Sequence, residues 1–208
     1  GVPEHPGPLP DDATLETRSL HVAQAIDLCY QVYLDEDAAA PDRAVALCWV
    51  LHLVGDLHQP CHAGSLYAEG VFPGGDRGAN SLKLVGGGNL HATWDGLLGG
   101  RATPGLIRKR VAELRNEVKE ARRNRGPLTP GVWRNWCAHS IELAQTHVYT
   151  REVLKPIQLA QRGLIEEMPT YRLSQAYFQN AGKVARKQAA FAGVRLSSML
   201  KLPIESRP

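Results

Sequence analysis

Hydrophobic positions recur every three or four residues along most of the chain, which is the period of amphipathic helices. Start signals at Thr14, Asp42 and Asn89, and a first-turn proline at Pro130, support the same interpretation. The pattern predicts helices over residues 14–34, 43–57, 90–98, 106–125, 129–154 and 171–200, with a further helix that ends before Met168–Pro169. We therefore expect an all-α helical bundle, formed by one domain over residues 1–208.

The run RAVALCWVLHLVGDL, residues 43–57, is apolar nearly all round, so this helix is predicted to be buried on every side. Pro60 ends it. Cys29 and Cys48 both fall within apolar helical patterns and are expected to be buried free thiols. The four cysteines contain no CxxC pair, so they leave the compartment open.

Residues 63–88 break the helical pattern. The segment contains eight glycines and predicts a long loop, with at most a short strand at Leu82–Val85. A loop of this length inside a compact domain is typical of a functional segment.

Composition bounds the class of protein. A chain of 208 residues suits a single domain, and 43% hydrophobic with 22% charged residues is typical of a globular protein. The net charge of +3 is too small to indicate a polyanionic partner by itself. No apolar run approaches the roughly 18–20 residues of a membrane span, so none is predicted.

Three of the eight histidines lie within the stretch HLVGDLHQPCH, residues 52–62. His52 and Asp56 are four residues apart, as are His91 and Asp95 in the next short helix, so each pair shares a helix face. An imidazole nitrogen beside a carboxylate oxygen is a ligand set that suits zinc. His62 follows Pro60, so it can turn off the helix axis and complete a second set.

A helical histidine beside an aspartate is also common as a plain hydrogen-bonded pair. We favour a metal site because His52 and Asp56 lie in the helix predicted to be buried, where an uncompensated carboxylate is costly. The repeated pair strengthens this interpretation. His58 is expected to be a second-shell donor that orients a ligand, and Trp94 is expected in the core.

Three motifs then resemble a known family: HLVGDLHQPCH at 52–62, GGDRGAN at 74–80 and NLHATWD at 89–95. In this order they are similar to those of the zinc-dependent single-strand nucleases of the S1/P1 type, which include mung bean nuclease. The likeness continues more loosely to AGVRLSSML near the C-terminus. Two departures stand out: Cys61 replaces the usual leucine, and Ala79 replaces the second glycine of the loop, which matters if that position needs positive φ.

The resemblance implies a helical bundle of the type shared with zinc phospholipases C, and a site of three zinc ions. It implies that His62, His91 and Asp95 hold one zinc, while His52 and Asp56 contribute to a close pair that the catalytic Asp56 bridges. The remaining ligands of that pair lie upstream in the family. We therefore expect a further segment of about 50–60 residues before Gly1 in the intact protein.

The resemblance also implies an activity: hydrolysis of single-stranded DNA or RNA to 5′-mononucleotides, with 3′-nucleotidase activity. Asp76 and Asn80 are expected either to line the base-binding pocket or to hold the loop together. A monomer, secreted or periplasmic by the habit of the family, is expected. Two alternatives stay open: a phosphodiesterase like zinc phospholipase C, and a metal-binding remnant without catalysis.

Overall fold

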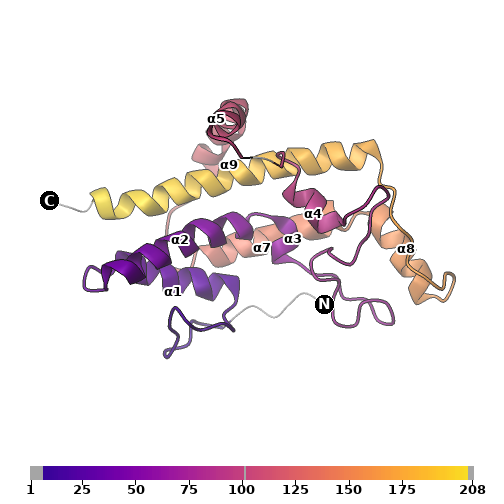
Figure 1. The fold of residues 1–208 in the computed structure, drawn as a ribbon, viewed down its shortest axis with the longest axis horizontal. Coiled ribbons are helices and arrows are strands. Elements are labelled where there is room, and N and C mark those ends of the chain that lie inside the picture. Colours follow the sequence, from indigo (N-terminus) through magenta and orange to yellow (C-terminus); the bar gives the residue numbers. More distant parts are fainter. Residues whose placement is uncertain (1–6, 101, 206–208) are drawn as a thin grey trace.

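The computed structural model describes residues 7–100 and 102–205, and the regular structure of this part is helical (Figure 1). The all-α fold expected from the hydrophobic period is confirmed. In chain order the elements are α1 (Val22–Leu34), α2 (Ala40–Leu57), α3 (Pro60–Ala63), α4 (Leu90–Asp95), α5 (Pro104–Glu113), α6 (Arg115–Asn124), α7 (Trp133–Leu143), the π-helical turn η1 (Ala144–Val148), α8 (Arg151–Gln161) and α9 (Gln175–Glu205).

The first helix begins later than its hydrophobic period predicted. α1 starts at Val22, because His21 caps it: the Ala23 N–H donates to His21 Nδ1 at 3.2 Å, and the His21 N–H donates to Gln24 Oε1 at 2.9 Å. This reciprocal pair is a capping box. The start predicted at Thr14 is wrong, since residues 14–20 form turns and irregular structure.

Two predicted long helices are each divided in the structure. Leu114 separates α5 from α6, and η1 with Tyr149 and Thr150 separates α7 from α8. The hydrophobic period of the sequence did not predict these breaks, because a short interruption leaves the spacing of apolar positions on either side intact. The last helix starts at Gln175 rather than Tyr171, since the Tyr171 N–H donates to the Lys83 carbonyl at 2.8 Å.

The interior contains two main hydrophobic clusters. One joins α1, α2, α7 and the later part of α9, and includes Ile26, Val54 and Met199. The other joins α4, η1, α8, the start of α9 and the glycine-rich loop. Trp94 belongs to the second cluster at 3% exposure, as predicted, and its Nε1–H donates to Tyr177 Oη at 3.1 Å. Because α2 ends against one cluster and α3 begins against the other, the turn between them is held from both sides.

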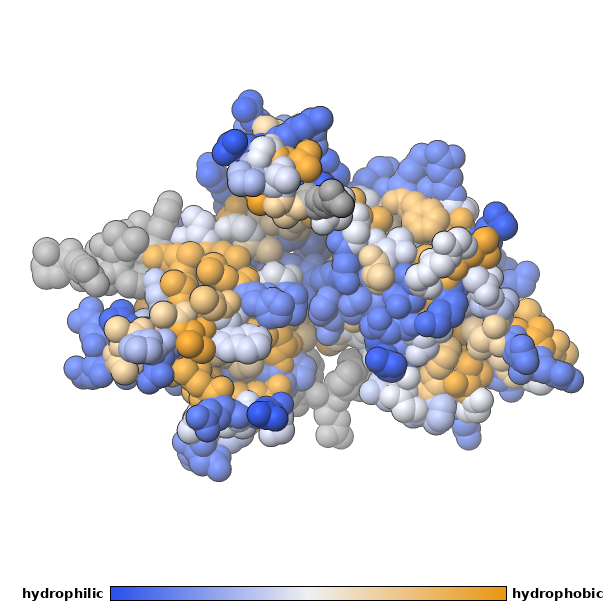
Figure 2. Space-filling model, viewed as in Figure 1, coloured by the Kyte–Doolittle hydropathy of each residue, from blue (hydrophilic) through white to orange (hydrophobic). Residues whose placement is uncertain are grey.

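The prediction that α2 is buried on every side is wrong. Val45, Trp49 and Leu51 are 48%, 46% and 43% exposed, and Figure 2 shows the hydrophobic area over this helix. Cys48 is exposed as well, whereas Cys29 is buried as expected. One side of α2 packs against α1, α7 and α9, and the opposite side has no covering element in the described part of the chain.

The loop at 63–88 is anchored without forming a sheet. Leu84 and Tyr171 make an isolated parallel bridge, and the Val85 N–H donates to the Tyr171 carbonyl at 2.9 Å. The short strand considered at Leu82–Val85 is thus reduced to single bridges, because its partner is one extended residue before α9. Within residues 7–100 and 102–205 no helix combines the length and apolarity that crossing a bilayer requires.

Candidate metal centre

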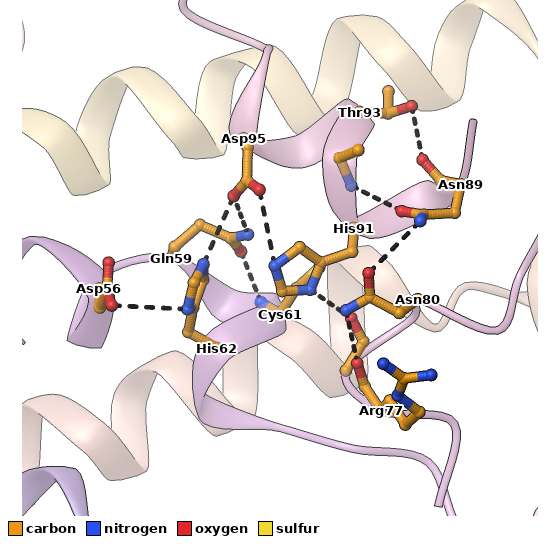
Figure 3. Close-up of polar contacts among 12 residues, drawn as sticks. Asp56, Gln59, Cys61, His62, Arg77, Asn80, Asn89, His91, Thr93 and Asp95 are labelled. Carbon is orange, nitrogen blue, oxygen red and sulfur yellow. Dashed lines mark hydrogen bonds and ion pairs between the residues drawn. The ribbon is translucent and has the colours of Figure 1, made fainter. Parts of the chain in front are cut away.

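The turn between α2 and α3 carries His62 back toward the end of α2. α2 ends at Leu57, and Gln59 Oε1 accepts from the Cys61 N–H at 2.6 Å, which caps α3 with Pro60 in its first turn. As a result His62 Nδ1 lies 3.7 Å from Asp56 Oδ2 (Figure 3). The helix break that the sequence predicted at Pro60 is confirmed.

α4 supplies the other side of the centre. Asn89 Oδ1 accepts from the Ala92 N–H at 2.8 Å and so caps the helix. The four-residue spacing puts His91 Nε2 3.6 Å from Asp95 Oδ2, as the shared helix face predicted. His62 Nε2 faces the other oxygen of the same carboxylate, Oδ1, at 3.5 Å (Figure 3).

His62, His91 and Asp95 form a group that fits a metal ion. Each side chain offers one ligand atom, and the three atoms lie within 4.8 Å of one another. A tetrahedral zinc with bonds of about 2.0–2.2 Å separates its ligands by about 3.3–3.6 Å, and His62 Nε2 and His91 Nε2 each lie at such a distance, 3.5 and 3.6 Å, from one oxygen of the Asp95 carboxylate. Two imidazoles and a carboxylate are also a donor set that zinc accepts. The residues present therefore fit this ion.

The glycine-rich loop orients His91. His91 Nδ1 lies 2.7 Å from the Gly78 carbonyl oxygen, so Nδ1 carries the proton and Nε2 keeps its lone pair toward Asp95. A metal-binding histidine commonly has such a partner on its other nitrogen, because this contact fixes the tautomer and the ring plane.

The loop reaches His91 through a left-handed turn. Arg77, Gly78 and Ala79 have φ of 60°, 60° and 67°, a region that non-glycine residues seldom adopt. A Cβ at Gly78 would overlap the carbonyl oxygen of Cys61, so only glycine lets the loop approach α3 this closely. Ala79 does occupy a positive-φ position, so its replacement of glycine there introduces strain.

Replacing Gly78 with alanine should therefore lower both stability and zinc affinity. The overlap with Cys61 moves the carbonyl that holds His91, and loss of such a partner typically weakens metal binding about 10–100-fold. Gly70→Ala is the control, because Gly70 also has positive φ (74°) but has open space around it. Thermal unfolding and a zinc titration measure the two effects. Equal zinc affinity in the two variants would contradict the role assigned to Gly78.

Gln59 is a site residue that the motif analysis did not identify. Its Nε2–H donates to Asp95 Oδ1 at 2.8 Å, while its Oε1 caps α3, so it ties the carboxylate to the helix that carries His62 (Figure 3). The position beside Pro60, typical of an N-cap, was the available signal. The contact to α4 was not predictable, because 36 residues separate the partners.

His52 and Asp56 form a second pair next to this group. His52 Nε2 lies 3.1 Å from Asp56 Oδ2, as their spacing predicted, and the His52 side chain is 61% exposed. Trp49 packs edge-on against His52 with ring centroids 5.8 Å apart. The argument that burial of these side chains requires a cation is wrong, since the side chains of His52 and Asp56 are 61% and 32% exposed. In the described residues they do not join the three-residue group.

His58 is bound to other parts of the helical core rather than to the candidate ligands. It is 3% exposed, and its Nδ1 lies 2.7 Å from the Val54 carbonyl while Arg195 Nη1 approaches its Nε2 at 2.6 Å. Burial lowers the pKa of His58 to about 4, so the ring is neutral and accepts from Arg195. The expectation that it donates to a metal ligand is corrected: both nitrogens are taken, and the contact anchors α9 instead.

Asp76 is a structural residue of the loop. It is fully buried, and Oδ1 accepts from the Leu66 N–H, Ser65 Oγ and Tyr149 Oη at 2.9, 3.1 and 2.9 Å. Burial beside this carboxylate raises the pKa of Tyr149, so the phenol stays protonated and donates. Of the two roles considered for Asp76, holding the loop is the one that its contacts fit, and lining a substrate pocket is excluded by its burial.

Asn80 acts in the same way at the surface of the loop. Its Nδ2–H donates to the Arg77 carbonyl at 2.8 Å, and its Oδ1 accepts from Asn89 Nδ2 at 3.3 Å (Figure 3). Because Asn89 caps α4, these contacts connect the left-handed turn to the helix that carries His91 and Asp95.

Cys61 does not belong to the ligand set. Its side chain is buried in the cluster that contains Trp94, and burial together with the nearby Asp95 and Asp76 carboxylates raises the pKa of the thiol. A thiol that stays protonated is a poor metal ligand and a poor nucleophile. It therefore packs as the apolar residue it replaces.

A cavity of about 370 Å³ opens directly beside the candidate ligands. Its lining combines polar side chains, among them Asp56, His62, Asp95 and Gln188, with apolar ones from α4 and α9, among them Leu98, Ala185, Ala189 and Ala192. Polar and apolar side chains together are the usual lining of a small-molecule pocket.

The chain is similar to known proteins. Residues 9–205 match the S1/P1 nuclease family. The chain is 26% identical over 167 residues to Endonuclease 4 of Arabidopsis thaliana and 25% identical over 167 residues to Endonuclease 5 of the same plant. In both cases the match covers 78% of this chain and 52% of the relative. The chain thus spans about half the length of the curated relatives it matches.

Proposed function

The chain belongs to the S1/P1 nuclease family, and on that premise we propose that it binds zinc and hydrolyses phosphodiester bonds of single-stranded DNA or RNA. The observation that supports the proposal is the group of His62, His91 and Asp95, which offers two imidazole nitrogens and a carboxylate oxygen within 4.8 Å of one another. Release of 5′-mononucleotides and removal of 3′-phosphates belong to the same proposal.

Three zinc ions are proposed for the intact protein. His62, His91 and Asp95 would hold one, and His52 with Asp56 would contribute to the other two, with Asp56 between them. The position of Asp56 supports this, because its Oδ2 faces His52 on one side and His62 on the other. When bound, zinc polarises phosphoryl oxygens and supplies a nucleophile at neutral pH.

The protein's own residues would position the reacting phosphate. Asp56, His62 and Asp95 all line the cavity, and His62 contacts both carboxylates, so a phosphodiester bound there would meet both candidate sites. Gln59 and the Gly78 carbonyl keep Asp95 and His91 in one orientation, which lowers the cost of assembling the site. Leu98, which lines the same cavity and is 36% exposed, offers apolar surface to a base or sugar.

The direct test is hydrolysis by the purified intact protein, including any residues that precede Gly1, with zinc added. Single-stranded DNA, the same sequence as a duplex, and phosphatidylcholine are compared at equal phosphate concentration. Cleavage of the single strand above the other two is the expected result. Preferential cleavage of phosphatidylcholine would contradict the nuclease proposal in favour of a phospholipase C-like enzyme, and zinc binding without any hydrolysis would favour a metal-binding remnant.

Two further properties are part of the proposal. We expect a monomer, which light scattering coupled to gel filtration measures, and we expect action outside the cytoplasm, as in other members that the sequence resembles. Fractionation of the source cells tests the location.

A further inference from the structure

Positive charge is concentrated in two segments of the chain. Residues 104–125, which form α5 and α6, contain eight cationic and three acidic side chains. Residues 175–200 of α9 contain four cationic side chains and no acidic one. These two segments thus carry a net +9, whereas the whole chain carries +3. The charge is therefore distributed unevenly along the chain although the net charge is small. A local excess of positive charge produces an electrostatic field that attracts polyanions.

The acidic residues of α6 do not neutralise its exposed face. Glu117 binds Arg186 at 2.7 Å and Glu120 binds Lys187 at 3.1 Å, and both contacts hold α6 against α9. α5 and α6 also carry exposed cations without an ion-pair partner in the described part of the chain: Arg108, Lys109, Arg115, Lys119, Arg122 and Arg123. Figure 2 shows hydrophilic residues surrounding a few hydrophobic ones over α5.

A groove of about 610 Å³ runs between α6 and α9. Arg122 and Arg125 line it, and the Arg125 Nη1–H donates to Ser198 Oγ at 2.8 Å. The rest of the lining is largely apolar and includes Val111, Leu114, Val118 and Val194. The groove therefore offers cations and apolar surface side by side.

This groove adjoins the cavity of the candidate metal centre. Ala189 of α9 lines both, so the two hollows are neighbours along this helix. Near the end of α4, Gly99 lies against the Arg110 guanidinium, since a Cβ there would overlap it. A side chain of α5, Arg110, thus contacts the segment that follows α4, four residues after Asp95.

We propose that the groove between α6 and α9 holds the phosphate backbone of a single-stranded nucleic acid whose scissile phosphate lies in the metal-side cavity. This inference rests on the proposed function and adds to it a second contact surface. A single strand presents both phosphates and flat apolar bases, so it matches a cationic, apolar groove, whereas a duplex exposes mainly phosphates. An anionic lipid surface has similar chemistry, but continuity with a phosphodiester site favours the nucleic acid.

The test removes the two groove cations as Arg122→Gln with Arg125→Gln. Binding of a fluorescent phosphorothioate strand of about 12 nucleotides, which resists hydrolysis, is measured by anisotropy at several salt concentrations. Losing two phosphate contacts should reduce the slope of log affinity against log salt by about 1.4 and weaken binding about 10-fold or more at low salt. Arg151→Gln with Arg162→Gln on the α8 side is the control of equal charge loss, since both side chains are exposed and neither lines the groove.

Arg122→Lys with Arg125→Lys keeps both charges and should retain the salt slope. A retained slope in this variant shows that the glutamine variant binds weakly because it lost charge and not because its fold is disturbed. Equal slopes in the glutamine variant and the α8 control would overturn the proposal. A glutamine variant that loses binding to phosphatidylserine vesicles but keeps the strand would overturn it in favour of a lipid surface. If no variant or wild-type chain hydrolyses single strands, the proposed function fails, while the anisotropy result still decides whether the groove binds them.

Discussion

Replacing Asp56 with asparagine should lower hydrolysis of single-stranded DNA by about 100–1000-fold, the range seen when one preorganised charged or polar group of a catalytic site is lost. Asparagine keeps the shape of the side chain but removes the negative charge that faces His52 at 3.1 Å and His62 at 3.7 Å. The proposal places two cations at this carboxylate, so loss of its charge weakens both. Initial rates of the intact protein, with any residues upstream of Gly1 included and zinc saturating, measure the effect.

Asp42→Asn is the matched control for this experiment. Asp42 lies in the first turn of the same helix, at the end away from the site, and its side chain is exposed. Its replacement removes the same charge from α2 and should leave the rate within about twofold, since first-turn carboxylates contribute mainly a few tenths of a kcal/mol to helix stability. Near-normal turnover in the Asp56 variant would contradict the role of that carboxylate between metals.

Replacing His91 with alanine should remove about one zinc per chain. The variant keeps His62 and Asp95 but loses one of three protein ligands, and a zinc site normally needs at least three. Elemental analysis after gel filtration measures the metal content. Zinc should also raise the unfolding temperature of the wild type more than that of the variant, because a ligand that binds only the folded state stabilises it.

His139→Ala is the control for the metal measurement. His139 is an exposed histidine on α7 that lies 3.5 Å from Glu142, so it is also paired with a carboxylate within one helix, but without a third ligand. Its loss should leave both the zinc content and the zinc-dependent rise in unfolding temperature unchanged. Unchanged zinc in the His91 variant would rule out the three-residue assignment.

The two histidine–aspartate pairs show which contacts can be predicted from sequence spacing and which cannot. Spacing predicted that His52 faces Asp56 and that His91 faces Asp95, and both contacts are present because residues four apart on a helix are neighbours. Spacing could not tell whether two such pairs lie near each other. That depended on the turn at His58–Gln59 and on how α4 packs, neither of which follows from local periodicity.

Burial was predicted less well than local geometry. The apolar run of α2 suggested that His52 and Asp56 are enclosed, yet Trp49 and Leu51 on the same helix are among its exposed residues. Hydrophobicity indicates that a face prefers to be covered, but only the arrangement of the other elements decides which faces are covered. The family motifs were informative despite this error, since they depend on residue identity and order rather than on exposure.

The sequence by itself determined the helical class, the start of α4 at Asn89, the helix break near Pro60 and the two histidine–aspartate pairs, because each depends on residues within one or two turns. Only the tertiary structure decided that His62 meets Asp95, that the Gly78 carbonyl orients His91 and that Gln59 holds Asp95. It also decided that His58 binds Arg195 on α9, 137 residues away, instead of serving the centre. These contacts join segments far apart in the chain, so they depend on how the helices and the loop pack together, which no local pattern encodes.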